Sequence, residues 1–363
     1  MRASFGPSFA EIVSPPRTRA LWVTLASVAL GLVASGVVFA VYGVAPIAAY
    51  SVLLRETLGD ARGQAEVVRK SLPLILIAVG LAFAFRARFF NIGAEGQLLA
   101  GAAAASGVAL FSDIPAPYTV WAMFLAGFAA GALWAFLPAL LKVKLGVNEV
   151  ITTLMLNFVA VYGIEWLING PWKGRTVMGF AYSDPFPAWA RLPVIPGTRI
   201  HWPTLVLGLV AAVALHFVLA RTRLGFEVRV LGHNPEAAAY AGIDALRVTL
   251  AAALIAGGLA GLAGVGEVGG THFRLRSPSQ ISPGFGYTAI LAAQLARGQP
   301  LAAALAALFL GLIFAAGDVA RALLRMPPQV PEMISGLLLL AVVSAEIFIR
   351  YQLRFPTVPK GGD

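Results

Sequence analysis

Long apolar stretches separated by short polar connections follow one another along almost the whole chain. About ten of them approach the roughly 20 residues that a helix needs to cross a bilayer. They lie at residues 21–42, 71–85, 97–111, 118–141, 149–168, 203–220, 248–268, 285–296, 299–318 and 331–349. This pattern predicts an all-α integral membrane protein with about ten transmembrane helices.

The composition supports a membrane protein and argues against a soluble one. Hydrophobic residues make up 59% of the 363 positions and charged residues 12%, about half the charged share of a soluble domain. A soluble fold of this length could not hide so much apolar surface. The net charge of +10 comes from basic residues scattered at the ends of apolar stretches. Anionic membrane lipid is therefore the expected counter-charge, and nucleic acid is not an expected partner.

The first apolar stretch is too long for the core of a signal peptide, so it is expected to remain as the first helix. Basic residues are most frequent in the short alternate connections, which the positive-inside rule assigns to the cytoplasm. The N- and C-termini are then both cytoplasmic, in an inner (plasma) membrane protein. The expected division is a cytoplasmic N-terminal segment (1–20), a polytopic transmembrane domain (21–350) and a cytoplasmic C-terminal tail (351–363).

A polar segment with two glycines separates the second and third apolar stretches. It reads Phe-Phe-Asn-Ile-Gly-Ala-Glu-Gly-Gln over residues 89–97. Hydrocarbon offers no water to a broken backbone or a carboxylate, so such sequence is tolerated only where protein covers it or where it lines a cavity. Two roles stay open for Asn91, Glu95 and Gln97. They line a solute path, for which they supply donors and acceptors, or they cap the ends of broken helices.

Asn157 and Gln294 extend this set of path candidates, because an amide at lipid depth is costly unless it is paired. Asn148 and Glu149 begin an apolar stretch, and a helix-capping role is favoured for them. A second glycine-rich segment, Ser282–Ile290, leads into a short apolar stretch as the first one does. Such interrupted or re-entrant segments in two halves of a chain point to a 5+5 inverted repeat around one path.

The longest cytoplasmic connection, residues 221–247, contains a short predicted helix. Asn234 is suited to cap it, Pro235 to occupy its first position and Glu236 to face the positive end of its dipole. Gly242 then ends the helix after about two turns. A rigid helix with small side chains suits a groove on another protein. The alternative is a structured loop on the bilayer surface.

No phosphate-binding GxxxxGK[ST] motif occurs in the sequence, so the chain has no ATPase signature of its own. One GxGxxG string is present, but no strand precedes it, and a dinucleotide site is not expected there. With neighbouring glycines it is expected to allow close helix packing. These glycines are Gly257, Gly258, Gly261, Gly264, Gly266 and Gly269, with Gly127 and Gly131 on another stretch.

Two carboxylates near predicted outer ends, Glu267 and Asp318, support a rival class. In an ion-coupled secondary transporter such residues would bind the coupling ion. Asp318 has Arg321 one turn further on, however, and this spacing favours a structural ion pair. A membrane scaffold that transports nothing is a third class, but it leaves the polar breaks unexplained. Neither His233 nor His272 has a partner at metal-binding spacing, and no metal site is expected.

Four motifs together resemble the permease subunits of ABC importers. They are FNIGAEGQ (90–97), LGVNEVITTLMLN (145–157), GHNPEAAAYAGI (232–243) and SPGFGYTAI (282–290). The resemblance is to the branch that handles simple sugars, nucleosides and branched-chain amino acids, and it runs from about residue 70 to about residue 350. Within that branch the first two motifs are most similar to nucleoside-type and related simple-sugar permeases.

The resemblance implies a subunit that forms half of a translocation pathway, catalyses no reaction and binds no cofactor. Its expected partners are two cytoplasmic ATPase subunits that hydrolyse ATP, a second permease subunit in a heterodimer, and an extracytoplasmic binding protein or lipoprotein. The outer loop from Gly170 to Trp202 is a candidate contact for that binding protein. The expected cargo is a nucleoside or related simple sugar, with branched-chain amino acids as the alternative. The short helix of residues 232–243 corresponds to the coupling helix that docks on the ATPase. Its candidate residues are Gly232, Asn234, Pro235, Ala237, Ala238 and Gly242.

Overall fold

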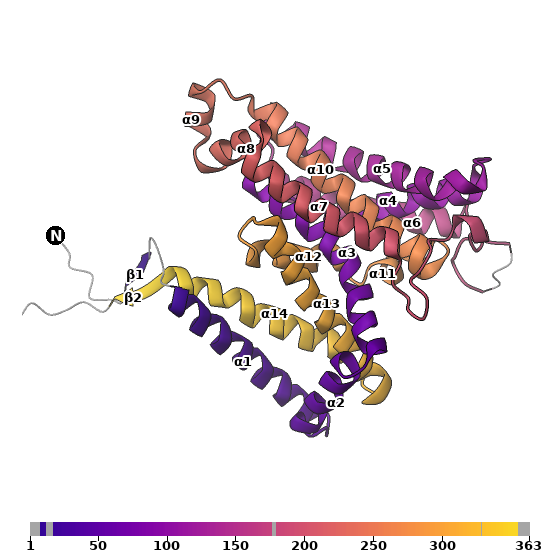
Figure 1. Cartoon of the computed structure of the whole chain (residues 1–363), viewed down its shortest axis with the longest axis horizontal. Coiled ribbons are helices and arrows are strands. Elements are labelled where there is room, and N and C mark those ends of the chain that lie inside the picture. The colour runs from indigo at the N-terminus through magenta and orange to yellow at the C-terminus, as the bar shows by residue number, and fades with distance from the viewer. Residues whose placement is uncertain (1–7, 12–16, 176–178, 328, 355–363) are drawn as a thin grey trace, which may run out of the picture. The chain divides into compact units, whose positions relative to one another are not determined.

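The computed structural model describes residues 8–11, 17–175, 179–327 and 329–354, whose regular structure is helical except for one two-stranded ribbon (Figure 1). The α-helices are α1 (Arg17–Val41), α2 (Pro46–Leu58), α3 (Ala61–Arg86), α4 (Ala94–Phe111), α5 (Ala116–Leu145), α6 (Glu149–Asn169), α7 (Trp202–Arg221), α8 (Arg223–His233), α9 (Pro235–Tyr240), α10 (Ala245–Gly266), α11 (Pro278–Ile281), α12 (Phe285–Leu295), α13 (Pro300–Leu323) and α14 (Gln329–Arg350). A 3₁₀ turn, η1 (Ala188–Ala190), and a π-helical turn, η2 (Glu267–His272), complete the helical elements. The strands are β1 (Ser8–Glu11) and β2 (Tyr351–Arg354).

The chain forms two compact units, and the boundaries between them fall inside α2 and α13. One unit comprises Met1–Glu56 with Ala316–Asp363, and the other comprises Thr57–Ala315. In the first unit α1 packs on α14, where a Cβ on Gly31 would lie 3.1 Å from Ala341. A sharp bend of 111° separates α1 from α2. Strand β1 pairs antiparallel with β2, with Ser8 opposite Arg354, so the two described ends of the chain lie side by side.

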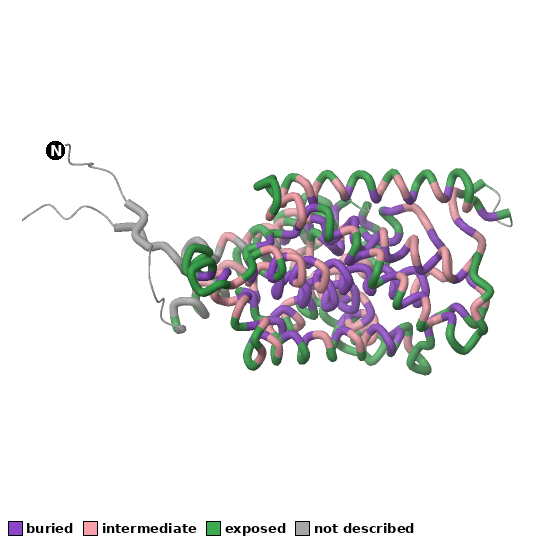
Figure 2. The backbone as a smooth tube through the Cα atoms, turned by 90° about the horizontal axis from the view of Figure 1, so that it is seen from above, coloured by how far each residue is buried: buried purple, intermediate pink, exposed green. Residues whose placement is uncertain are grey.

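The second unit is built around α3 and α10. Protein buries 89% of the apolar window of α3 and 78% of that of α10 and its π-helical extension, against 28% for α6 and for α7. Figure 2 shows the buried residues gathered along the inner helices and the exposed ones along the outer helices. Helices α6 and α7 therefore present broad apolar faces outward, as helices in contact with lipid or another subunit do.

Glycines on one face of α10 allow this helix to lie against α4 and α5 at backbone contact distance. A Cβ on Gly261 would overlap the carbonyl oxygen of Gly127, and one on Gly257 would overlap that of Gly131. A Cβ on Gly264 would overlap the carbonyl oxygen of Leu98 in α4. In lipid, where apolar side chains gain little by leaving their solvent, close packing of small residues holds helices together. The predicted packing role of the GxGxxG region is thereby confirmed.

Each of the ten apolar stretches predicted from the sequence coincides with a helix. Within the described residues, seven helices are long and apolar enough to cross a membrane, or eight if the bent pair α1–α2 forms one span. Helix α12 has 11 residues, which is too short for a full crossing. The sequence did not predict α2 or α8, since neither has a long apolar stretch.

Helices α8 and α9 lie at one end of the second unit, and the connection between α6 and α7 lies at the other (Figure 1). Helix α7 runs between these ends, from Trp202 to Arg221, and α8 follows it after a single residue. The polar segment of residues 89–93 connects α3 to α4 directly, at the same end as α8, where Arg88 contacts the last residues of that helix. It is thus a turn between two helices of spanning length.

Candidate functional site

The turn between α3 and α4 is anchored by a buried aromatic ring. Phe89 is fully buried against alanines of α3, α5 and α10, and its N–H donates to the carbonyl oxygen of Ala84 at 3.1 Å. Arg88 just before it has a φ of 54°, in the left-handed region that non-glycine residues seldom adopt. This conformation reverses the chain within a few residues. The following segment, Asn91–Gln97, is thereby directed back into the helical bundle.

Two of the predicted path residues, Asn91 and Gln97, pair with each other. The Asn91 Nδ2 donates to Gln97 Oε1 at 2.8 Å, and the Gln97 Nε2 donates to Asn91 Oδ1 at 3.0 Å. Asn91 Oδ1 also accepts the N–H of Gly93 at 2.9 Å. Both side chains are buried. A reciprocal amide pair meets the hydrogen-bonding needs of polar groups that have no access to water.

A third predicted residue, Asn157 of α6, caps the N-terminus of α4. Its Oδ1 accepts the N–H of Gly96 at 2.8 Å, and its Nδ2 donates to the carbonyl oxygen of Ile92 at 2.9 Å. The same Nδ2 lies 3.2 Å from the hydroxyl of Tyr287 in α12. The first N–H groups of a helix lack intrahelical partners, so this amide supplies in protein what water supplies at an exposed helix end.

Glu95, in the first turn of α4, caps α12 in turn. Its Oε2 accepts the N–H of Gly286 at 2.7 Å, and a Cβ on Gly286 would overlap the backbone nitrogen of Glu95. The N-termini of the two helices therefore meet, and a carboxylate lies where both helix dipoles are positive. Asn91, Glu95, Gln97 and Asn157 form one connected cluster, which we call the helix-end cluster.

Gln294, the remaining path candidate, lies apart from this cluster. It is exposed in the last turn of α12, about two turns beyond Gly286. Whether any of the five candidates contacts a transported solute stays a prediction. The geometry shows that four of them shape the turn and two helix ends.

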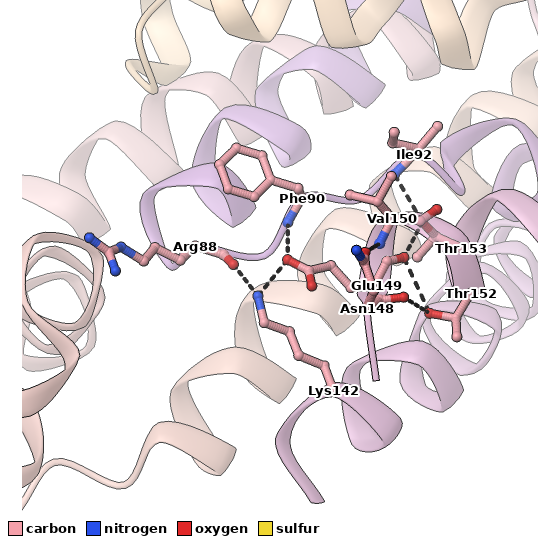
Figure 3. Close-up of polar contacts among 9 residues, drawn as sticks. All are labelled: Arg88, Phe90, Ile92, Lys142, Asn148, Glu149, Val150, Thr152 and Thr153. Carbon is pink, nitrogen blue, oxygen red and sulfur yellow. Dashed lines mark hydrogen bonds and ion pairs between the residues drawn. The ribbon is translucent and has the colours of Figure 1, made fainter. Parts of the chain in front are cut away.

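Behind the turn, Lys142 and Glu149 form an ion pair that the sequence reasoning missed (Figure 3). Lys142 Nζ lies 2.6 Å from Glu149 Oε1 and also donates to the carbonyl oxygen of Arg88. Glu149 Oε1 accepts the N–H of Phe90 at 3.4 Å. Asn148 caps α6 through the N–H of Val150 at 2.9 Å, as predicted. The signal for this ion pair in the sequence was a Lys and a Glu seven residues apart with Gly146 between them. Gly146 adopts a left-handed φ of 66° and brings the ends of α5 and α6 together.

Helix α9 has the caps that the sequence predicted. Asn234 Oδ1 accepts the N–H groups of Glu236 at 2.9 Å and Ala237 at 3.2 Å. At the other end the N–H of Ile243 donates to Ala238 at 2.9 Å and that of Gly242 to Ala239 at 3.0 Å. Together with a φ of 72° at Gly242, these bonds form a complete Schellman motif.

The exposed side of α9 carries small and aromatic residues. Pro235, Ala237 and Ala239 are exposed, and the Tyr240 side chain is 99% exposed, whereas Ala238 is buried. A rigid helix that buries only one of its six residues contributes little to the fold that carries it. Its shape suits a docking surface for another protein.

A second group of buried polar side chains lies where α10 passes into its π-helical turn. Glu267 is buried and its Oε2 lies 3.7 Å from Nε2 of His272, while His201 packs against Gly266 and Gly270. Burial, aided by the charge of Arg69, lowers the pKa of His201 to about 4, so its ring is neutral at pH 7. No local pattern in the sequence indicated that His201 joins this group.

No cluster of three or more His, Asp or Glu side chains among the described residues could hold a metal ion. The predicted ion pair between Asp318 and Arg321 is present, one turn apart on α13. This pairing gives Asp318 a structural role.

Comparison with known proteins identifies the family of this chain. Residues 64–343 match the family model described as the branched-chain amino acid transport system permease component. The glucose ABC transporter permease TsgB13 of Haloferax volcanii is 37% identical, over 97% of this chain and 95% of the relative. The guanosine ABC transporter permease NupP of Bacillus subtilis is 31% identical, over 92% of this chain and 95% of the relative.

The nucleoside ABC transporter permease NupB of Lactococcus lactis is 32% identical, over 69% of this chain and 71% of the relative. No solved structure matches the chain. The family matched is one of transporter permeases, and the ion-coupled transporter considered from the sequence is not favoured. The chain therefore belongs to the branched-chain amino acid transport system permease family and is an ABC transporter permease, not an enzyme.

Proposed function

We propose that this permease imports nucleosides or related simple sugars, powered by ATP hydrolysis in a separate subunit. Relatives named for glucose, guanosine and nucleosides all handle cargo that carries a sugar ring. Recognition of such cargo needs both donors and acceptors for hydroxyl groups. Branched-chain amino acids, named in the family description, are the alternative cargo that an uptake assay would reveal.

The observation that carries this proposal is the helix α9, which is capped at both ends, exposed and located at one end of the second unit. We infer that α9 is the coupling helix that docks on the ATPase. Gly232 allows α8 to approach Arg86, Asn234 and Pro235 start the helix, Ala237 faces outward, Ala238 packs inward and Gly242 ends it. Closure of the ATPase pair would then push on a rigid body.

The helix-end cluster is proposed as a gate or path element, together with Gln294 further along α12. Two half-exposed groups lie beside the cluster, the Phe90 ring and the Tyr287 ring, which are 44% and 42% exposed. A tilt of α4 against α12 would break the bond from Gly286 to Glu95 and change what these rings face. Selectivity would then belong largely to an external binding protein.

The proposed assembly contains two ATPase subunits, a second, sister permease subunit in a heterodimer, and an extracytoplasmic binding protein or lipoprotein. The proposed topology has an even number of spans, with both termini cytoplasmic in an inner membrane and residues 221–247 as the coupling loop. The pairing of β1 with β2 supports an even number of crossings, since it brings the two ends together. The meeting of the α4 and α12 N-termini is what a 5+5 inverted repeat would produce.

Transport by the assembled complex in proteoliposomes tests the function. Labelled guanosine, ribose, glucose and leucine are each supplied as the solute to be transported. ATP or a non-hydrolysable analogue is present in the compartment that the ATPase faces. We expect uptake of guanosine or of one of the sugars that requires hydrolysable ATP and survives an ionophore. Uptake of leucine alone would contradict the proposed cargo. Uptake that persists without the ATPase and collapses with an ionophore would contradict ATP coupling altogether.

Substitution of Gly242 by Trp tests the role of α9. The left-handed φ of 72° at Gly242 disfavours any side chain, at a cost of about 1 kcal/mol, and a bulky ring would disturb the docking surface. We expect ATP hydrolysis to continue while uptake is lost. Gly43→Trp is the matched control, since Gly43 has a φ of 76°, open space around it and a position between α1 and α2. Equal loss of uptake in both variants would contradict the assignment.

A further inference from the structure

Arg88 makes contacts in two opposite directions. Its side chain reaches the end of α8, where Nε donates to the carbonyl oxygen of Gly232 at 3.0 Å and Nη2 donates to that of His233 at 3.3 Å. The last carbonyl groups of a helix have no intrahelical partner, and a cation there also meets the negative end of the dipole. The guanidinium of Arg88 therefore serves as the C-terminal cap of the helix that leads into α9.

The main chain of Arg88 is held on the other side. Its carbonyl oxygen accepts from Lys142 Nζ, which is paired with Glu149 at 2.6 Å, and Glu149 in turn accepts the N–H of Phe90. In Figure 3 the Arg88 side chain points away from this group while its carbonyl points toward it. Arg88 thus stands between the end of α8 on one side and the adjoining ends of α5 and α6 on the other.

A backbone contact reinforces the same junction. A Cβ on Gly232 would overlap the carbonyl oxygen of Arg86, so α8 lies directly on the last turn of α3. Arg86 Nε donates to the carbonyl oxygen of Gly298 at 3.0 Å, which adds the α12–α13 connection to the group. Residues that lie more than 140 positions apart in sequence meet here. The junction leaves little freedom for α8 to move without the turn that contains Arg88.

The turn continues directly into the helix-end cluster. Ile92 N–H donates to Thr153 Oγ1 at 3.2 Å, and the Ile92 carbonyl accepts from Asn157. We propose that Arg88 is a positioning residue that makes the coupling helix α9, the turn and the adjoining end of α6 move as one body, and so transmits movement of α9 to the N-termini of α4 and α12. This inference rests on the proposed docking of α9 on the ATPase. It assigns to a single side chain the step between ATPase movement and the transport path.

The variant Arg88→Asn isolates this side chain. Asparagine tolerates the positive φ of Arg88 better than other residues do, but it is too short to reach Gly232 or His233. Arg88→Lys keeps one cationic donor and is the conservative variant. Arg325→Asn is the matched control, because Arg325 has a similar positive φ of 51°, is exposed and lies in the α13–α14 connection, outside the proposed coupling loop.

The complete transporter with its ATPase, sister permease and binding protein is reconstituted with each variant, and uptake of labelled guanosine or glucose is measured together with ATP hydrolysis. We expect Arg88→Asn to lower uptake per ATP hydrolysed by about two- to thirtyfold, the range in which mutations along a coupling route act. Arg88→Lys is expected to lie between the parent and Arg88→Asn. Arg325→Asn is expected to match the parent.

A distance measurement gives a readout that loss of fold would not mimic. The chain has no cysteine, so Ala237→Cys on α9 and Ile151→Cys in the first turn of α6 accept a pair of spin labels. Both side chains are exposed. With Arg88 present, we expect the same distance distribution in the nucleotide-free and the ATP-trapped states. With Arg88→Asn, we expect the distribution to change with nucleotide.

The outcomes separate this inference from the coupling role of α9. Unchanged uptake per ATP in Arg88→Asn, or loss of the ATPase from the purified complex, would overturn the transmission role while leaving α9 as a docking helix. A label distance that already changes with nucleotide in the parent would overturn it too. Failure of Ala237→Cys to cross-link to the ATPase would overturn both proposals.

Discussion

The helix-end cluster and the glycine face of α10 solve the same physical problem in different ways. In both, the interior of a membrane protein contains backbone that lacks regular helical hydrogen bonds or is not covered by side chains. Water is absent there and cannot take the place of the missing partners. The cluster satisfies its backbone with side chains from other elements, through Asn157 and Glu95. The glycine face needs no side chain at all, because α10 lies directly on the backbone of α4 and α5.

This difference separates a part that can change from a part that cannot. Hydrogen bonds between three helices can be exchanged for other bonds when a helix tilts, so the cluster suits a moving element. The dispersion attraction between glycine backbones in contact falls steeply with distance, so the α10 face suits a rigid element. We therefore expect movement during transport to occur at the helix-end cluster, with α10, α4 and α5 moving together.

The largest effect is expected on the glycine face. Gly261→Ala would push a methyl group into the carbonyl of Gly127, which cannot move away as a flexible side chain can. We expect destabilisation by about 2–3 kcal/mol from overpacking. Gly163→Ala on α6 meets nothing within 4 Å and is expected to be neutral or to stabilise by up to about 1 kcal/mol. Thermal midpoints in detergent measure both, and similar midpoints would refute backbone contact as the basis of packing.

A smaller effect is expected from Asn157→Leu. This change removes the partner of the Gly96 N–H and of the Ile92 carbonyl, and the two lost hydrogen bonds are expected to cost about 1 kcal/mol each. Asn157→Asp keeps the acceptor for Gly96, and as a buried, protonated acid it also keeps a donor for the Ile92 carbonyl. Asn157→Leu is expected to lower the thermal midpoint more than Asn157→Asp does. The reverse order would mean that the amide contacts something other than the two backbone groups.

The smallest effect on stability is expected at Glu95. Glu95→Gln keeps an oxygen that can accept the N–H of Gly286, so the change in stability should stay within about 1 kcal/mol, while Glu95→Leu should cost about 1–3 kcal/mol. The matched assay is uptake per ATP hydrolysed. If Glu95 only caps α12, Glu95→Gln will transport like the parent. A stable Glu95→Gln protein that no longer transports would indicate that its charge acts on the path.

Much of the fold was predictable because each signal is local. Apolar length defines a spanning helix wherever the helix lies, and Asn234, Pro235 and Gly242 define both ends of α9 within a few residues. The role of the α10 glycines could also be predicted, since small residues at helical spacing mark close contact. The bend after α1, the helix α8 and the π-helical turn at Glu267 could not be predicted, because tertiary packing determines them and no local sequence pattern indicates them.

The sequence by itself determined that this protein is a helical membrane permease with an exposed, capped helix in a cytoplasmic connection. It also marked Asn91, Glu95, Gln97 and Asn157 as polar groups that need partners at lipid depth. Only the tertiary structure decided which partners they have, since each bond that joins α4 to α6 or α12 links residues far apart in sequence. The same holds for Arg88, whose contacts with α8 depend on how two distant helix ends meet.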